Sequence, residues 1–280
     1  MSIQTPQDQY VKVGQINTRF WALGDEGTAV ILIHGHGGSV ENWRLNINAL
    51  AQNHRVYAMD LVGFGRSDKT SIPDSFSCGA QFVNDFMEVQ HIDRASLIGN
   101  SMGGGLTLQF AIQFPDEVEK LVLANAAGLG KELTLTLRLL TLPLIGEFLS
   151  KPSRKGTTRF LKECVYDSAL ITDELIETFY QMSIIPGAQK SFLSTLRAGA
   201  NLCGQHADVI RSIVDNLASI NVPTLILWGQ QDRILPIAHA YVAQGRIPNA
   251  KLQILDRCGH LLQLEHPEEF NALLLEFLAR

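Results

Sequence analysis

The chain has 280 residues, of which 46% are hydrophobic, and it carries a formal net charge of −5. This length is enough to bury a sizeable core, either as one large domain or as one domain with an insertion. The acidic balance and the absence of a Lys/Arg run exclude the pattern typical of nucleic-acid-binding proteins. The N-terminal sequence has neither the basic nor the apolar segment of a signal peptide, so we expect a cytoplasmic protein.

Short apolar runs predict seven strands, at 17–24, 28–35, 54–63, 94–100, 118–127, 222–229 and 250–259. The first two of these strands are expected to be neighbours in the sheet. A helix is predicted over 101–114, ended by Pro115, and another over 267–280, with Pro267 in its first turn. Near-continuous apolar strands that alternate with helices predict an α/β fold, with a mostly parallel sheet covered on both faces.

The alternation of strands and helices stops in the middle of the chain. Residues 127–206 have helical character and no convincing buried strand. We predict that they form a helical cap inserted into a core made of residues 1–126 and 207–280. The apolar stretch 133–149 in this cap is shorter than the ~20 residues of a spanning helix. It therefore predicts a cap helix that lines an apolar pocket or, alternatively, an interfacial surface for lipid substrates, without stable membrane insertion.

The four cysteines do not have metal-ligand spacing. This predicts reduced thiols and no metal site, with one disulfide as the alternative, for Cys78, Cys164, Cys203 and Cys258.

The segment Gly99-Asn100-Ser101-Met102-Gly103 matches the pattern G-x-S-x-G between a predicted strand and a predicted helix. This context is typical of a nucleophile elbow, in which a strained turn presents the serine hydroxyl at the carboxyl edge of the sheet. Gly99 and Gly103 are expected because the strand and the helix pass close to each other there. Ser101 is the predicted nucleophile.

A serine hydroxyl needs a general base, and the base needs an acid to orient it. In chain order the acid and then the histidine follow such an elbow. His260 lies just past the last predicted strand, and Asp232 lies in the loop after the strand 222–229. The carboxyl ends of parallel strands share one edge of the sheet, so both residues are expected beside Ser101. The carboxyl end of the strand 118–127 could also host an acid, but the residue there is Asn125.

The glycine-rich turn "HGHGG" follows the strand 28–35. Backbone N–H groups in such a turn can stabilise a developing oxyanion. We predict that the oxyanion hole is formed by the backbone amides of Met102 and His36, with Gly37 as the alternative to His36.

Together, "HGHGG", "DLVGFGRSD", "GNSMGG", "GQQDRILP" and "CGHLLQLEHP" resemble the α/β-hydrolase superfamily over nearly the whole chain. The resemblance implies an eight-stranded, mostly parallel sheet, a helical cap, and no metal or organic cofactor. Within the superfamily, "GNSMGG" and the segment around His260 are most similar to meta-cleavage product hydrolases, which break a C–C bond in products of aromatic-ring cleavage. By this resemblance Asn46 and Asn100 match polar positions near the substrate.

Three features depart from the pattern of the meta-cleavage product hydrolases. The turn continues as Gly-Gly-Ser rather than Gly-Pro-Gly, Leu261 replaces the usual tryptophan after the histidine, and the cap segment 183–196 has no arginine. Arg197 is the nearest alternative cation. An acidic substrate needs a charge-assisted partner in a closed pocket. The residues expected to line the substrate pocket are Gly37, Asn46, Asn100 and Leu261. None of these residues carries a charge that could pair with a substrate carboxylate.

Three function classes follow. The main expectation is a carboxylesterase that acts on small to medium acyl esters through an acyl-enzyme. The alternative is C–C bond hydrolysis of 2-hydroxy-6-oxo-dienoates by the same residues, and a further alternative is a non-catalytic ligand-binding protein on this fold. The expected partner is a small apolar or aromatic ester or ketone. A homodimer remains open.

Overall fold

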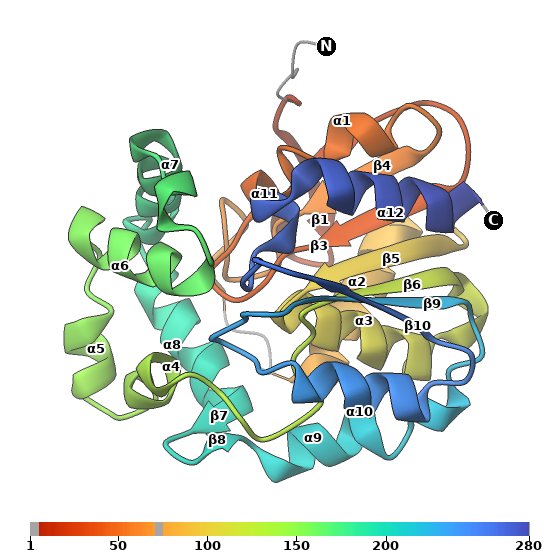
Figure 1. The fold of residues 1–280 in the computed structure, drawn as a ribbon. Helices are drawn as coiled ribbons and strands as arrows, with labels where there is room; N and C mark the ends of the chain where they lie inside the picture. The colour runs from red at the N-terminus through yellow and green to blue at the C-terminus, as the bar shows by residue number, and fades with distance from the viewer. Residues whose placement is uncertain (1–5, 71–74, 280) are drawn as a thin grey trace.

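The computed structural model describes residues 6–70 and 75–279, which form an eight-stranded sheet surrounded by helices (Figure 1). The strand order is β1-β2-β4-β3-β5-β6-β9-β10. The pairs β1–β2 and β2–β4 are antiparallel, and every other pair is parallel. The predicted α/β fold with a mostly parallel sheet is confirmed. The strands are β1 (Gln9–Val13), β2 (Ile16–Leu23), β3 (Ala29–Ile33), β4 (Arg55–Met59), β5 (Ala95–Asn100), β6 (Val118–Ala124), β9 (Thr224–Gly229) and β10 (Lys251–Leu255).

Two details of the sheet differ from the sequence prediction. β1 was not predicted, and β2 is not a neighbour of β3, because β4 lies between them. After β3 the chain crosses over and forms β4 between β3 and β2. The strands β2 and β3, which were predicted to be neighbours, are therefore separated by β4. The register pairs Phe20 of β2 with Met59 of β4, and Ile33 of β3 with the same Met59.

Helices cover both faces of the sheet. One face packs against α2 (Phe76–Val89), α3 (Met102–Gln113), α9 (Ala207–Val214) and α10 (Ala238–Arg246). The other packs against α1 (Ile47–Leu50), α11 (Leu262–Glu265) and α12 (Pro267–Ala279). Successive residues of β3 alternate between the two cores, with Ile31 on the first face and Leu32 on the second. The central strands read as unbroken apolar runs because both of their faces are buried.

The helices α4 to α8 lie between β6 and β7 in the chain, and Figure 1 shows them gathered at one side of the sheet. They are α4 (Leu135–Leu140), α5 (Ile145–Leu149), α6 (Arg154–Cys164), α7 (Asp173–Ser183) and α8 (Ala188–Gly199). A short ribbon of β7 (Ala200–Asn201) and β8 (Gly204–Gln205) follows them. The boundaries of a separate cap domain at 127 and 206 remain a prediction.

Within the described ranges, no helix is long and apolar enough to cross a bilayer. The four cysteines are all free thiols in the structure.

Candidate active site

Ser101 sits alone between the end of β5 at Asn100 and the start of α3 at Met102. Its backbone angles are φ 57° and ψ −118°, a region that a residue with a Cβ rarely adopts. The surrounding backbone holds this strained turn: the Ser101 N–H donates to Ala124 O (2.9 Å), and the Ser101 carbonyl accepts from Gly105 and Ala127. Such strain persists only where neighbouring structure fixes it, and it is typical of functional sites.

Glycines surround Ser101 because the backbones at the elbow are nearly in contact. A Cβ on Gly99 would lie 2.2 Å from Gly103 O, and one on Gly103 would lie 2.2 Å from Ile33 O. A Cβ on Gly104 would lie 2.6 Å from that of Ala126. The predicted close passage of strand and helix is confirmed.

Asp232 and His260 meet at the carboxyl edge of the sheet. His260 Nδ1 lies 2.7 Å from Asp232 Oδ2, and both side chains are almost completely buried. The other Asp232 oxygen accepts the backbone N–H groups of Ile234 (2.7 Å) and Leu235 (3.1 Å). The carboxylate is therefore fixed from both sides, and it can hold the imidazole in one tautomer with Nε2 free to act as a base.

Ser101 and His260 line one small cavity of about 40 Å³. Asn100 and Leu261, two of the predicted pocket residues, also line it. Among the hydrogen bonds formed within residues 6–70 and 75–279, none joins Ser101 to His260. The structure thus places the three predicted triad residues at one site, with the acid–base pair hydrogen-bonded.

The side chains of Asn100, Asn125 and Glu265 help to hold the loop that carries His260. Asn100 Nδ2 donates to the His260 carbonyl (3.1 Å), and Asn125 Nδ2 donates to the Gly259 carbonyl (2.9 Å). Glu265 accepts the Gly259 N–H (2.9 Å) through one oxygen and the Tyr166 N–H (2.6 Å) through the other.

Asn125 and Glu265 were not predicted from the sequence as positioning residues. Asn125 Oδ1 also accepts the N–H of Gly229 at the end of β9, so this amide bridges β9 and the His260 loop. The signal that could have found Asn125 is its place after β6, at the same edge as Ser101. For Glu265 the signal is its place in the "EHP" segment near His260.

The predicted oxyanion donors, Met102 and His36, line a second cavity together with Ser101. In the described structure neither the Met102 N–H nor the His36 N–H is used in a hydrogen bond. Buried His34 holds the turn, because its Nε2 accepts the Leu61 N–H (3.0 Å). Burial lowers the pKa of His34 to about 4, so the ring is neutral and can accept this bond.

The His36 ring forms part of the cavity wall. It packs against the rings of Phe192, with centroids 4.2 Å apart, and Phe64, with centroids 5.4 Å apart. Loss of hydration lowers the pKa of His36 to about 3, with a smaller contribution from neighbouring His34. His36 therefore presents an uncharged ring at neutral pH.

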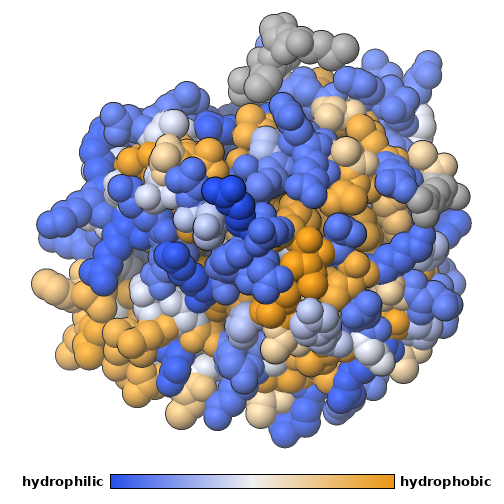
Figure 2. All heavy atoms as spheres, in the orientation of Figure 1, coloured by the Kyte–Doolittle hydropathy of each residue, from blue (hydrophilic) through white to orange (hydrophobic). Residues whose placement is uncertain are grey.

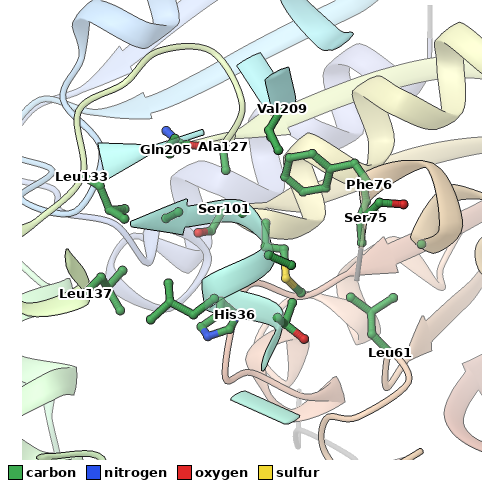
Figure 3. A pocket seen from close by; sticks show the side chains of 18 of the residues that line it. His36, Leu61, Ser75, Phe76, Ser101, Ala127, Leu133, Leu137, Gln205 and Val209 are labelled. Carbon is green, nitrogen blue, oxygen red and sulfur yellow. The ribbon is translucent and has the colours of Figure 1, made fainter. Parts of the chain in front are cut away.

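The second cavity has a volume of about 140 Å³ and a mainly apolar lining. Figure 3 shows Ser101 between Leu133 and Leu137 on one side and Phe76 and Val209 on the other. Among the described residues that line the two cavities there is no lysine or arginine. This space suits an apolar group and offers no cation to a substrate carboxylate.

The remaining pocket candidates lie outside these cavities. Asn46 is fully buried and donates to Gln263 O (3.1 Å) and Asn271 Oδ1 (2.9 Å). Gly37 has φ +73°, and a Cβ there would lie 3.0 Å from the Phe192 ring. Arg197 pairs with Glu147 (2.7 Å) and donates to the Thr141 carbonyl (3.0 Å), so it does not reach either cavity.

The described chain contains no cluster of three or more His, Cys, Asp or Glu side chains that could hold a metal ion.

Residues 28–267 match the model of the alpha/beta hydrolase fold family. A 2-hydroxy-6-oxononadienedioate/2-hydroxy-6-oxononatrienedioate hydrolase of Comamonas testosteroni is 33% identical over 91% of this chain and 88% of its own length. A 2-hydroxy-6-oxo-6-phenylhexa-2,4-dienoate hydrolase of Burkholderia cepacia has the same identity and coverage. The solved meta-cleavage product hydrolase of Pseudomonas fluorescens IP01 superimposes with a TM-score of 0.83, at 31% identity and 96% coverage of each chain. This chain is therefore a hydrolase that belongs to the alpha/beta hydrolase fold family and is similar to the meta-cleavage product hydrolases within it.

Proposed function

We propose that this protein hydrolyses the C–C bond of a 2-hydroxy-6-oxo-dienoate, with Ser101 as nucleophile, His260 as general base and acid, and Asp232 as the residue that orients His260. The observation that carries the proposal is the 2.7 Å Asp232–His260 pair at the cavity that Ser101 also lines. Relatives named for this reaction match the chain over 91% of its length. This proposal replaces the carboxylesterase as the main expectation.

In the proposed reaction the dienol is first converted to its keto form, as the proton of the 2-hydroxyl group passes to C5 with the aid of His260. His260 Nε2 then takes the proton of Ser101 as Oγ attacks the C6 carbonyl carbon. The backbone N–H groups of Met102 and His36 stabilise the resulting oxyanion. Because C5 is now a CH2 group, the C5–C6 bond can break with its electron pair delocalised through the C3=C4 double bond onto the C2 oxygen, and His260 returns a proton to that oxygen. The C6 side remains on Ser101 as an acyl ester. Water, activated by His260, hydrolyses this ester and releases a carboxylic acid.

The cavity of about 140 Å³ supports an apolar substituent on C6. Its apolar lining, with Phe76, Leu133 and Leu137, can bury an aromatic or alkyl group without leaving a buried polar group unpaired.

A second candidate is carboxyl ester hydrolysis through the same acyl-enzyme. It is favoured by the uncharged lining of both cavities, because a dienoate carboxylate would lack a charge-assisted partner there. Arg197, the nearest alternative cation in sequence, is already occupied by Glu147. A neutral ester does not need such a partner.

The two candidates are separated by assaying one preparation on 2-hydroxy-6-oxo-6-phenylhexa-2,4-dienoate and on p-nitrophenyl butyrate. Ser101→Ala is compared with Ser212→Ala, an exposed serine on α9. Faster turnover of the dienoate, lost by about 10³- to 10⁶-fold in Ser101→Ala only, supports the first candidate. Turnover of the ester alone supports the second. Turnover of neither substrate contradicts both and favours the non-catalytic alternative.

A further inference from the structure

A group of large apolar side chains is exposed on the first part of the segment between β6 and β9. We define the apolar ridge as Leu135 on α4, Leu144 immediately before α5, and Ile145, Phe148 and Leu149 on α5. Leu144 is 83% exposed and Phe148 is 80% exposed. Five neighbouring apolar side chains in water are unusual for a surface that contacts nothing.

The ridge has a fixed shape. Arg197 on α8 donates to the Thr141 carbonyl (3.0 Å) and the Leu142 carbonyl (3.2 Å), which holds the turn between α4 and α5. The same guanidinium pairs with Glu147 (2.7 Å) and so neutralises the acidic residue beside the ridge. Leu144 has φ 66°, a conformation that favours glycine, yet it carries an exposed apolar side chain.

Cationic side chains follow the ridge directly in the chain. We define the cationic stripe as Lys155, Arg159 and Lys162, which are spaced four and three residues apart on α6 and therefore share one helix face. All three are exposed, and none takes part in an ion pair within the described ranges. Exposed Lys151, between α5 and α6, adds a further charge.

Positive charge is concentrated in the sequence between residues 133 and 162, and acidic residues follow on α7, where Glu177 pairs with Arg154. Residues 133–162 contain six Lys or Arg side chains and one acidic residue, whereas the whole chain carries a net charge of −5. The rest of the molecule is therefore acidic. In Figure 2 an apolar area covers the region of α4 and α5 at the lower left, and hydrophilic side chains cover α6 just above it. The apolar ridge and the cationic stripe thus lie next to each other at one end of the molecule.

We propose that this face docks on a membrane surface that contains anionic phospholipids. The apolar ridge would enter the boundary between headgroups and acyl chains, and the cationic stripe would contact the anionic headgroups. A peripheral surface of this kind needs both an apolar contribution and an electrostatic one. Binding is reversible and involves no membrane-spanning segment.

A second copy of this chain fits the face less well. A two-fold interface brings the same surface of each copy together, so it would place two cationic stripes near each other. An anionic bilayer instead complements the charge of the stripe. Docking also places the bilayer beside α4, whose Leu137 lines the apolar cavity while Leu135 faces outward. The proposal is independent of the reaction catalysed.

The test is co-sedimentation of the full chain with vesicles of phosphatidylcholine alone and of phosphatidylcholine mixed with phosphatidylglycerol. The wild type is expected to bind the mixed vesicles. Leu144→Ser combined with Phe148→Ser is expected to weaken binding by about 10-fold or more, because apolar burial is lost. The triple variant Lys155→Gln, Arg159→Gln and Lys162→Gln is expected to weaken binding by about 100-fold, and added salt should have a similar effect. Leu202→Ser, an exposed apolar residue outside the ridge, should bind like the wild type.

All of these variants should retain the turnover of substrate in solution, so failure of docking and failure of the proposed reaction are distinguishable. Lack of wild-type binding to the mixed vesicles would overturn the proposal. Equal binding to both vesicle types would overturn its electrostatic part. A dimer in light scattering that dissociates in the Leu144/Phe148 variant, without vesicle binding, would assign the face to a second copy.

Discussion

The side-chain amide of Asn100 donates a hydrogen bond to the backbone carbonyl of His260 at 3.1 Å. Asn100 immediately precedes Ser101, so this contact ties the nucleophile elbow to the loop that carries the candidate base. A second donation from the same amide, to Ala124 O (3.2 Å), anchors it on β6. The relative position of Ser101 and His260 thus depends on an amide that takes no part in the chemistry.

Asn100→Asp should separate the elbow from the His260 loop. The carboxylate cannot donate, and it would face the carbonyl oxygens of Ala124 and His260. We expect the free energy of unfolding to fall by about 1–3 kcal/mol, and kcat/KM to fall with it. Urea unfolding and turnover measure the two effects. Asn53→Asp, at an exposed position, is the control and should change neither.

Asp232→Asn should leave the fold intact and reduce kcat by about 10⁴-fold. The amide can still accept the N–H groups of Ile234 and Leu235, but its NH₂ group would face His260 Nδ1 and favour the wrong tautomer. Steady-state kinetics and circular dichroism test this expectation. A variant that keeps most of its activity would show that another carboxylate orients His260.

Ser101→Gly should be more stable than Ser101→Ala by about 1 kcal/mol. Both variants lack the hydroxyl, and only glycine relieves the backbone strain at φ 57°. Equilibrium unfolding of the two inactive variants measures the difference. Equal stabilities would mean that the elbow stores little strain.

Gly103→Ala should destabilise the protein by about 3 kcal/mol or more, because the new Cβ would overlap the carbonyl oxygen of Ile33. Gly245→Ala is the matched substitution in α10, where a Cβ meets nothing within 4 Å. There we expect stabilisation of about 0.5–1 kcal/mol from helix propensity. Thermal unfolding of both variants should give shifts of opposite sign.

Glu265→Gln should weaken the support of His260. The carboxylate accepts two backbone N–H groups, from Gly259 and Tyr166, whereas an amide has only one oxygen. One N–H is left facing an NH₂ group, which costs about 1–3 kcal/mol of stability. We expect a lower kcat with a KM close to that of the wild type, because His260 is displaced while the cavity lining is unchanged. A higher KM at constant kcat would instead assign Glu265 to substrate binding.

The elements that could be predicted from the sequence are those whose burial is visible as a local run of apolar residues. β3, β5, β6 and β9 are buried on both faces, so their apolar runs were recognisable. β1 was missed because it is an edge strand in which only Val13 is buried. The separation of β2 from β3 depends on the path of the crossover, which local patterns do not encode.

The candidate site shows the same division. Ser101, Asp232 and His260 follow from motif and chain order, and the structure places them together. The roles of Asn125 and Glu265 depend on hydrogen bonds to backbone groups far along the chain, which no spacing rule reveals. Asn46 matched a family position, yet its amide is engaged by neighbouring backbone and side-chain groups.

The glycine contacts at the elbow have a consequence for how this scaffold can diversify. Backbone atoms of β3, β5 and α3 set the location of Ser101, and the side chains of the apolar cavity do not. Residues such as Leu133, Leu137 and Val209 can therefore be exchanged for larger or smaller ones without displacing the hydroxyl. Selection, natural or in the laboratory, can thus change substrate range at the cavity wall while the three glycines stay invariant.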